Sequence, residues 1–236
     1  MKLKIYIFAF LLMISIGVNA ENFDKPYIGI NLNYINASDD GEELSFNRAK
    51  GWGVWEENGW GTKNKIDDVG IGFQLGKNWV YKDYFLYGIE LGYQKNKSSD
   101  ENFQRDLSNG DDCAPASDCI FKTELNHTFT TTLKAGYLIT DKIAVYLLGG
   151  YTTSKVKRKI YDGWDQGRWI TDTKWQDGYV YGGGLDYLLN QNISLKLEYR
   201  YSDLGIYTYS SEAFTGVKEK QDLDFSVVSL GLNYLF

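Results

Sequence analysis

The stretch "LKLEYRYS", from Leu195 to Ser202, alternates apolar and polar side chains without interruption. In an extended strand, successive side chains point to opposite faces of the sheet. One face of this strand therefore carries leucine and tyrosine, and the other carries Lys196, Glu198 and Arg200. Such a sharply divided strand separates two environments, and the fold depends on which of the two is water.

Seven further segments alternate with the same period of two, which predicts a protein made of β-strands. The facing of one of them, 143–152, is ambiguous, because Val145 and Leu147 compete with Tyr146 and Leu148 for the apolar side. The eight segments are 26–35, 67–79, 84–94, 127–138, 143–152, 178–188, 195–202 and 224–236.

The connections between these segments alternate in length. Three are tight turns near 80–83, 140–142 and 190–192, and the other four are expected at about 35–66, 96–122, 157–177 and 205–220. Short turns at one end and long loops at the other are typical of outer-membrane barrels. The pattern predicts an all-β fold, an eight-stranded antiparallel up-and-down transmembrane β-barrel with four long external loops and three short periplasmic turns.

The composition of the two faces decides which one points inward. The less apolar face is rich in Gly, Ser, Thr and Asn, which suits the narrow interior of an eight-stranded barrel. Aromatic residues crowd the ends of the apolar stripes, as at a lipid–water boundary. The chain ends on alternating apolar residues that include Tyr234 and Phe236, a pattern expected of a signal for the barrel-assembly machinery. A soluble barrel, with its apolar face inside, explains these features less well.

The first twenty residues predict export. Lys2 and Lys4 precede an apolar run, and "VNA" ends at Ala20, which together indicate a cleaved signal peptide, 1–20, and a barrel domain, 21–236. A membrane anchor is the alternative, but the run is shorter than the ~20 residues of a span. The net charge of −6 argues against a nucleic-acid partner.

"LKLEYRYSDLG" and the terminal "SLGLNYLF" make the chain resemble the small outer-membrane β-barrels of opacity-protein and OmpA-like type, across residues 26–236. The resemblance implies a location in the bacterial outer membrane, in contact with its lipid and lipopolysaccharide. It also implies a role in envelope integrity, adhesion or the binding of host molecules.

The inward face then carries six charged residues, three of each sign. A buried charge must be paired or hydrogen-bonded, so we expect a network of ion pairs that fills the interior. Neighbouring strands place Glu90 near Lys134 and Asp186 near Lys196. The six residues are Glu90, Lys134, Asp186, Lys196, Glu198 and Arg200.

The expected external loops hold six of the seven tryptophans. Exposed Trp either packs on other rings or forms a recognition surface for host or surface glycans or proteins. In the oxidising compartment outside the inner membrane, Cys113 and Cys119 are expected to form a small loop disulfide, with free thiols or a metal site as alternatives. The six tryptophans are Trp52, Trp55, Trp60, Trp164, Trp169 and Trp175.

A catalytic site is not expected. His127 is the only histidine, and the position two residues later, where deacylase-type barrels have a serine, is Phe129. The sequence contains no phosphate-binding loop and no calcium-loop spacing, so no cofactor or metal is expected. The sequence therefore predicts an outer-membrane surface protein with a structural and adhesive role. The alternatives are a narrow porin-like pore and, third, a lipid A-modifying enzyme.

Overall fold

The computed structural model describes residues 22–47, 54–103, 105–106, 120–162, 168–210 and 217–236. Within these ranges, no helical segment reaches the length and hydropathy of a membrane span. The described chain consists of eight long strands and one strand of two residues. They are β1 (Pro26–Asn47), β2 (Val54–Tyr81), β3 (Phe85–Phe103), β4 (Arg105–Asp106), β5 (Ile120–Leu138), β6 (Ile143–Asp162), β7 (Arg168–Leu188), β8 (Ile193–Ser210) and β9 (Val217–Leu235).

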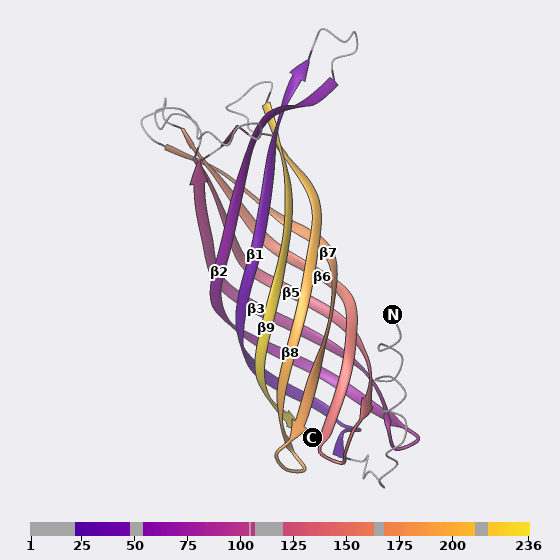
Figure 1. Cartoon of the computed structure of the whole chain (residues 1–236). Helices are drawn as coiled ribbons and strands as arrows, with labels where there is room; N and C mark the ends of the chain where they lie inside the picture. Colours follow the sequence, from indigo (N-terminus) through magenta and orange to yellow (C-terminus); the bar gives the residue numbers. More distant parts are fainter. Residues whose placement is uncertain (1–21, 48–53, 104, 107–119, 163–167, 211–216) are drawn as a thin grey trace, which may run out of the picture.

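The eight long strands close into one antiparallel barrel (Figure 1). Each pairs with its neighbour along the chain, and β1 pairs with both β2 and β9, so the sheet has no open edge. The two residues of β4 add only a short pairing to the outer part of β2. The predicted eight-stranded up-and-down barrel is therefore confirmed.

The three predicted tight turns lie together at one end of the barrel, beside the C-terminus (Figure 1). In the turn between β2 and β3, Lys82 and Asp83 both have positive φ, 52° and 63°. Two successive left-handed residues define the hairpin turn whose twist matches that of antiparallel strands. The short turn therefore fixes the register of β2 against β3, which runs from Tyr81 opposite Phe85 to Ile71 opposite Lys95.

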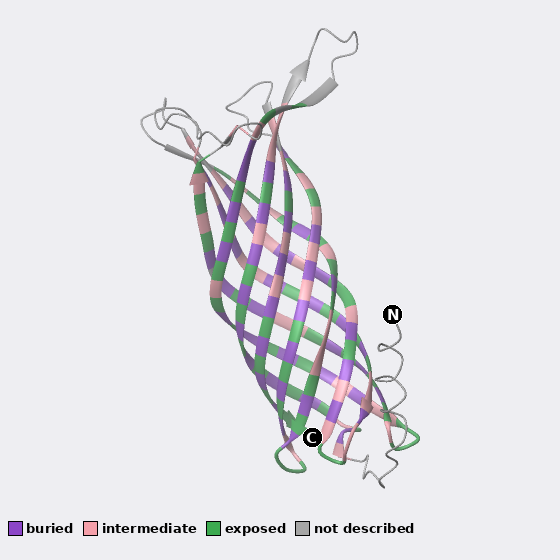
Figure 2. Cartoon of the chain, in the orientation of Figure 1, coloured by how far each residue is buried: buried purple, intermediate pink, exposed green. Residues whose placement is uncertain are grey.

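Within the apolar band, the outward side chains are apolar and many inward ones are small, polar or charged, as predicted. At the turn end itself, a first buried apolar cluster that includes Tyr27, Leu86 and Leu138 fills the interior. Along each strand, exposed and buried residues alternate (Figure 2). The ambiguous segment of β6 follows the same rule, because Leu147 is 73% exposed while Tyr146 and Leu148 are buried. The outward apolar residues form a continuous band around the barrel, as a bilayer requires.

Towards the loop end, the polarity of the two faces is reversed. Inward residues become apolar, and outward residues become charged or polar, as with Lys157 and Asp222. The inward residues form a second buried cluster inside the barrel. Its members are Ile35, Ala37, Ile66, Leu125, Val156, Leu204, Leu223, Phe225 and Val227.

The four long connections were predicted too long. The strands continue far beyond the apolar band, so that β1 reaches Asn47 and β2 begins at Val54. A transmembrane strand needs about 9–11 residues, whereas β1 has 22. Most of the segments expected as loops are therefore strand extensions, paired and filled with apolar side chains.

Candidate functional site

The barrel interior holds a network of buried charges near the turn end, with Glu90 of β3 at its centre. The carboxylate of Glu90 lies 2.6 Å from Lys134 Nζ and 3.1 Å from Lys196 Nζ. Tyr27 donates a hydrogen bond of 2.6 Å to the same carboxylate. Because Glu90 and Lys134 are buried, each charge depends on these partners in place of water.

Glu198 of β8 is a second centre of the network. Its carboxylate lies 3.4 Å from Lys196 Nζ, 3.8 Å from Lys134 Nζ and 3.4 Å from Arg200 Nε. Tyr146 donates a hydrogen bond of 2.8 Å to it. The structure thus brings together five of the six predicted interior charges, and it adds two tyrosine hydroxyls that sequence reasoning missed.

Asp186 departs from the expected arrangement. Its Cα is paired with that of Lys196, as predicted, yet it forms no ion pair with any residue that the structure describes, and its buried Oδ1 has no hydrogen-bond partner. The Lys196 side chain turns to Glu90 and Glu198 instead. The predicted pairing of these two charges is therefore wrong, because a long lysine side chain reaches across the lumen to more distant partners.

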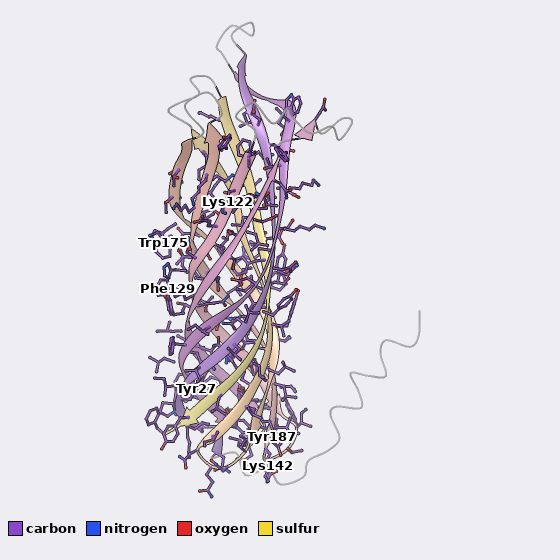
Figure 3. All side chains as sticks on the ribbon, turned by 90° about the vertical axis from the view of Figure 1, so that its left-hand side faces the viewer. Tyr27, Lys122, Phe129, Lys142, Trp175 and Tyr187 are labelled. Atoms are coloured by element: carbon purple, nitrogen blue, oxygen red, sulfur yellow. The ribbon has the colours of Figure 1, made fainter. Side chains whose placement is uncertain are left out.

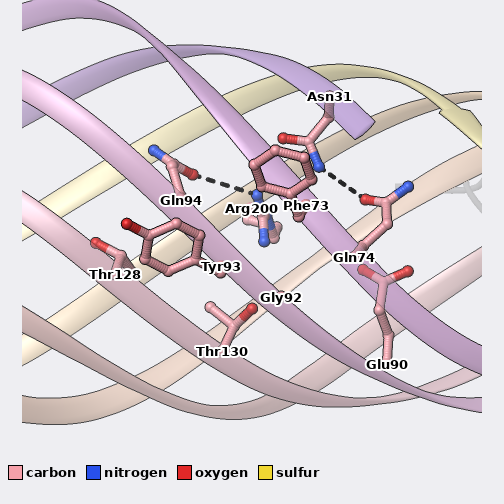
Figure 4. Close-up of a pocket in the computed structure, with 10 residues that line it drawn as sticks. All are labelled: Asn31, Phe73, Gln74, Glu90, Gly92, Tyr93, Gln94, Thr128, Thr130 and Arg200. Atoms are coloured by element: carbon pink, nitrogen blue, oxygen red, sulfur yellow. Dashed lines mark hydrogen bonds between the residues drawn. The ribbon is translucent and has the colours of Figure 1, made fainter. Parts of the chain in front are cut away.

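A small polar cavity lies beside the charge network (Figure 4). Arg200 donates a hydrogen bond of 3.5 Å to Gln94, and Asn31 donates one of 2.8 Å to Gln74. The cavity volume is about 10 Å³, which is room for about one water molecule. The cavity is therefore too small for a solute larger than water.

A second buried charge pair lies further towards the loop end, beyond the apolar cluster. Arg158 of β6 forms an ion pair with Asp39 of β1 and donates hydrogen bonds to Thr123 and Thr62. All four side chains are buried. Sequence reasoning missed this group because it assigned 157–177 to a loop; the available signal was the continued alternation "SKVKRKI" in β6.

The four predicted tryptophans that the structure describes all lie on strands, β2 and β7. Trp52 and Trp164 lie outside the described residues, as do Cys113 and Cys119, so their predicted roles stay predictions. Trp175 was expected in a loop, and this expectation is wrong: the residue lies on the outer face of β7. There it is 47% exposed.

The rings of Trp175 and Phe129 lie 5.9 Å apart and point away from the barrel (Figure 3). Trp60 belongs to β2, in the strand extension. Trp55 and Trp169 also fall within strands, β2 and β7.

The remaining predicted residues lie on the outer surface. His127 lies on the outer face of β5, where its Nδ1 is 2.9 Å from the hydroxyl of Tyr93. The rings of Tyr234 and Phe236 lie 5.2 Å apart in an edge-to-face arrangement at the turn end. Both are half exposed or more, as residues that face lipid would be.

A closed barrel with an outward apolar band and a charged interior defines a β-barrel of the outer-membrane class. The chain belongs to the family of outer membrane protein beta-barrel domains, whose model matches residues 6–236. It is therefore an outer-membrane protein, as predicted.

Similar proteins agree with this assignment. A "31 kDa outer-membrane immunogenic protein" of Brucella melitensis is 30% identical over 228 residues, covering 93% of this chain and 86% of that protein. A "25 kDa outer-membrane immunogenic protein" of Brucella abortus is 27% identical over 73% of this chain and 68% of its own length. The crystal structure of OprG from Pseudomonas aeruginosa shares the fold, with a TM-score of 0.54 and 16% identity over 91% of this chain and 98% of that one.

Proposed function

We propose that this protein is a surface barrel without a transport pathway, which serves the envelope as a rigid support and presents its outer strand extensions to the outside. The observation that carries the proposal is the filling of the interior at successive heights. From the turn end outward, the interior holds an apolar cluster with Tyr27 and Tyr146, the charge network, the polar cavity, the second apolar cluster and the Arg158–Asp39 pair.

Ion conduction would have to pass both apolar clusters. The inner cluster includes Phe23, Leu86 and Leu138, all nearly inaccessible to solvent. Moving an ion into such a region costs several kcal/mol. In addition, eight strands enclose only enough space for their own side chains. These considerations favour a plugged lumen over a narrow porin-like pore.

Planar bilayer recordings of the purified barrel test the plugged lumen. The expected result is the absence of stable conductance steps for the wild type and for E90Q, whose charge network is weakened. Steady unitary conductance in the wild type would contradict a plugged lumen and favour the narrow pore.

The surface role rests on the strand extensions. Beyond the apolar band, β1 and β2 remain paired out to Asn47 and Val54, and Trp55, Trp60 and Trp169 belong to the extended strands β2 and β7. Aromatic residues are enriched at the energetic centres of interfaces. The names of the Brucella relatives describe them as immunogenic, which agrees with a surface that meets host molecules. We infer that the extensions bind host or surface glycans or proteins.

Binding of whole cells to a glycan array and to host matrix proteins tests this role. We expect binding to fall in W55A/W169A and to remain in W79A, a matched loss of tryptophan from β2 near the turn end. Unchanged binding in W55A/W169A would show that these two tryptophans are not part of the recognition surface.

We also propose that the barrel is not an enzyme. Among the residues that the structure describes, His127 is hydrogen-bonded to a tyrosine hydroxyl and to no serine or cysteine nucleophile with a third orienting group. Mass spectra of lipid A from cells that express the wild type or H127A should be identical. A difference between them would favour the lipid A-modifying alternative.

A further inference from the structure

Three side chains form a row on adjacent strands just outside the apolar band. Lys95 of β3 pairs with His127 of β5, which in turn pairs with Lys155 of β6. Two residues closer to the membrane, the outward side chains on β3 and β5 are Tyr93 and Phe129. The row therefore lies where the outer surface changes from aromatic to charged.

Two irregularities in strand pairing coincide with this row. The register of β3 against β5 shifts immediately beyond Lys95, and that of β5 against β6 shifts between Leu125 and His127. A bulge inserts a residue and changes the direction of the side chains that follow it. In regular alternation Leu125 and His127 would share a face. The bulge instead allows Leu125 to enter the apolar cluster while His127 faces outward beside Tyr93.

A continuous aromatic surface adjoins the row: Tyr93 and Phe129 lie on its membrane side, and Trp175 is level with it on β7. The rings of Tyr93 and His127 are 6.0 Å apart, those of Tyr93 and Phe129 5.0 Å, and those of Phe129 and Trp175 5.9 Å. Phe129 and Trp175 are each nearly half exposed, and Figure 3 shows both on the outside of the barrel, with Lys122 further towards the loop end. Lys155 pairs with Trp175 across β6 and β7.

The two lysines of the row differ from those further out. Glu124 neutralises Lys159 at 2.6 Å, and Glu101 lies 3.3 Å from Lys122. Within the described ranges, by contrast, no carboxylate forms an ion pair with Lys95 or Lys155. Their charges therefore remain available to an external anion.

The surface charge differs between the two sides of the barrel. Asp177 of β7 is an acidic residue close to the row. Its carboxylate accepts a hydrogen bond of 2.6 Å from Tyr151. On β1, β8 and β9, which lie across the barrel from β5, four aspartates stand among the outward residues just beyond the apolar band, and a lysine further out, Lys220, is paired with Glu42. The four aspartates are Asp40, Asp203, Asp222 and Asp224.

We propose that the outer face of β3, β5 and β6 is a binding site for a phosphorylated lipid headgroup of the outer leaflet. Lys95 and Lys155 would hold the phosphate between them, because adjacent strands are about 4.8 Å apart and the two lysines are separated by one strand. The rings of Tyr93, Phe129 and Trp175 would pack against the sugar and the upper acyl chains. The acidic opposite face would repel the same headgroup, so the lipid would occupy one side of the barrel.

Native mass spectrometry of the full-length barrel in a neutral maltoside detergent, titrated with bisphosphorylated lipid A, tests the proposal. We expect K95Q/K155Q to bind lipid A about thirtyfold more weakly than the wild type, equivalent to about 2 kcal/mol, since a basic residue near an anionic membrane surface contributes about 1 kcal/mol. The charge-preserving K95R/K155R should retain binding. So should the matched control K82Q/K142Q, which removes two exposed lysines at the turn end.

Two further arms identify the ligand. Lipid A without phosphates should bind the wild type and K95Q/K155Q equally weakly. If excess inorganic phosphate alone displaced lipid A, the site would be a phosphate site and the proposed lipid ligand would be wrong. A shift in heat-modifiable electrophoretic mobility checks folding. If K95Q/K155Q does not fold, K155Q alone should bind about fivefold more weakly.

Equal affinity of K95Q/K155Q and the wild type would overturn the proposal, and so would an equal loss in K82Q/K142Q. A changed oligomeric state with unchanged lipid affinity would also overturn it. That outcome would mean that the basic face contacts the acidic face of a second copy.

Discussion

Replacing Glu90 by Gln removes one negative charge from the buried network while it preserves the size of the side chain. In the wild type, this carboxylate lies 2.6 Å from Lys134 and 3.1 Å from Lys196, and all three side chains are nearly inaccessible to solvent. In E90Q both lysines would depend on Glu198, which also contacts Arg200. One carboxylate would then have to balance three cations.

The expected cost follows from this burial. Removing one partner of a buried ion pair typically destabilises a protein by about 3–5 kcal/mol, because the remaining charge is left without compensation. With a denaturant dependence of about 4 kcal/mol per molar guanidinium, the unfolding midpoint should fall by about 1 M.

Unfolding in guanidinium, followed by tryptophan fluorescence of the barrel in lipid vesicles, measures the midpoint. The matched control is E101Q. Glu101 is on the same strand and also pairs with a β5 lysine, Lys122, at 3.3 Å, but this pair is exposed. Exposed pairs contribute about 1 kcal/mol or less, so the control midpoint should move by about 0.2 M or less.

Two results would refute this reasoning. One is a shift in E90Q no larger than that in E101Q, which would mean that the interior is solvated well enough to screen its charges. The other is a double variant, E90Q/K134M, less stable than E90Q alone. Removal of Lys134 should instead recover part of the loss, because it eliminates one of the uncompensated cations.

Three further predictions concern other parts of the barrel. E198K reverses a buried charge and should prevent folding into vesicles, whereas K218E in the strand extension should fold normally; heat-modifiable mobility distinguishes the two. G76V should reduce the refolded yield, because a Cβ at Gly76 would overlap the tyrosine ring that lies over it. Lys220 donates a hydrogen bond of 3.0 Å to Glu42, which lowers the pKa of Glu42 from its ordinary value of 4.5 and raises that of Lys220. The pair therefore stabilises the extension above the Glu42 pKa of the unfolded chain, and its contribution is lost as the pH falls through the lower folded value. Hydrogen exchange in β1 and β9 should be measured above and below the folded pKa of Glu42. Protection of the extension should fall at the lower pH in the wild type and not in Glu42→Gln.

The membrane-spanning part of the fold could be predicted because each strand there separates lipid from a polar interior. That requirement imposes a strict alternation of side chains, as in "LKLEYRYS", and it also identified most of the interior charges. Whether Asp186 forms an ion pair with Lys196 could not be predicted in the same way. Strand pairing places Asp186 beside Lys196, but the distances between side-chain ends depend on how each side chain crosses the lumen.

The strand extensions escaped prediction for a different reason. Outside the membrane the outward face is polar, so the apolar residues change to the opposite parity, as from Tyr34 to Ile35 in β1. On β5 this change of parity is not visible in the sequence. The bulge before His127 inserts one residue, so inward Leu125 and outward Phe129 are both at odd-numbered positions. A search for apolar residues of opposite parity at strand ends, such as Val156 in β6, would have identified the second cluster.

The reversal of polarity along the strands has a consequence for how the surface of this protein can change. Beyond the membrane, Ile35, Leu125, Val156 and Phe225 form an apolar core of their own, surrounded by polar residues as in a small water-soluble barrel. This core supports the outermost connections. Its contacts are made between strand residues, and they depend neither on lipid nor on the connections themselves. Substitutions and insertions at the tips can accumulate without weakening insertion into the membrane, so the exposed surface is free to diversify under selection while the barrel beneath it stays constant.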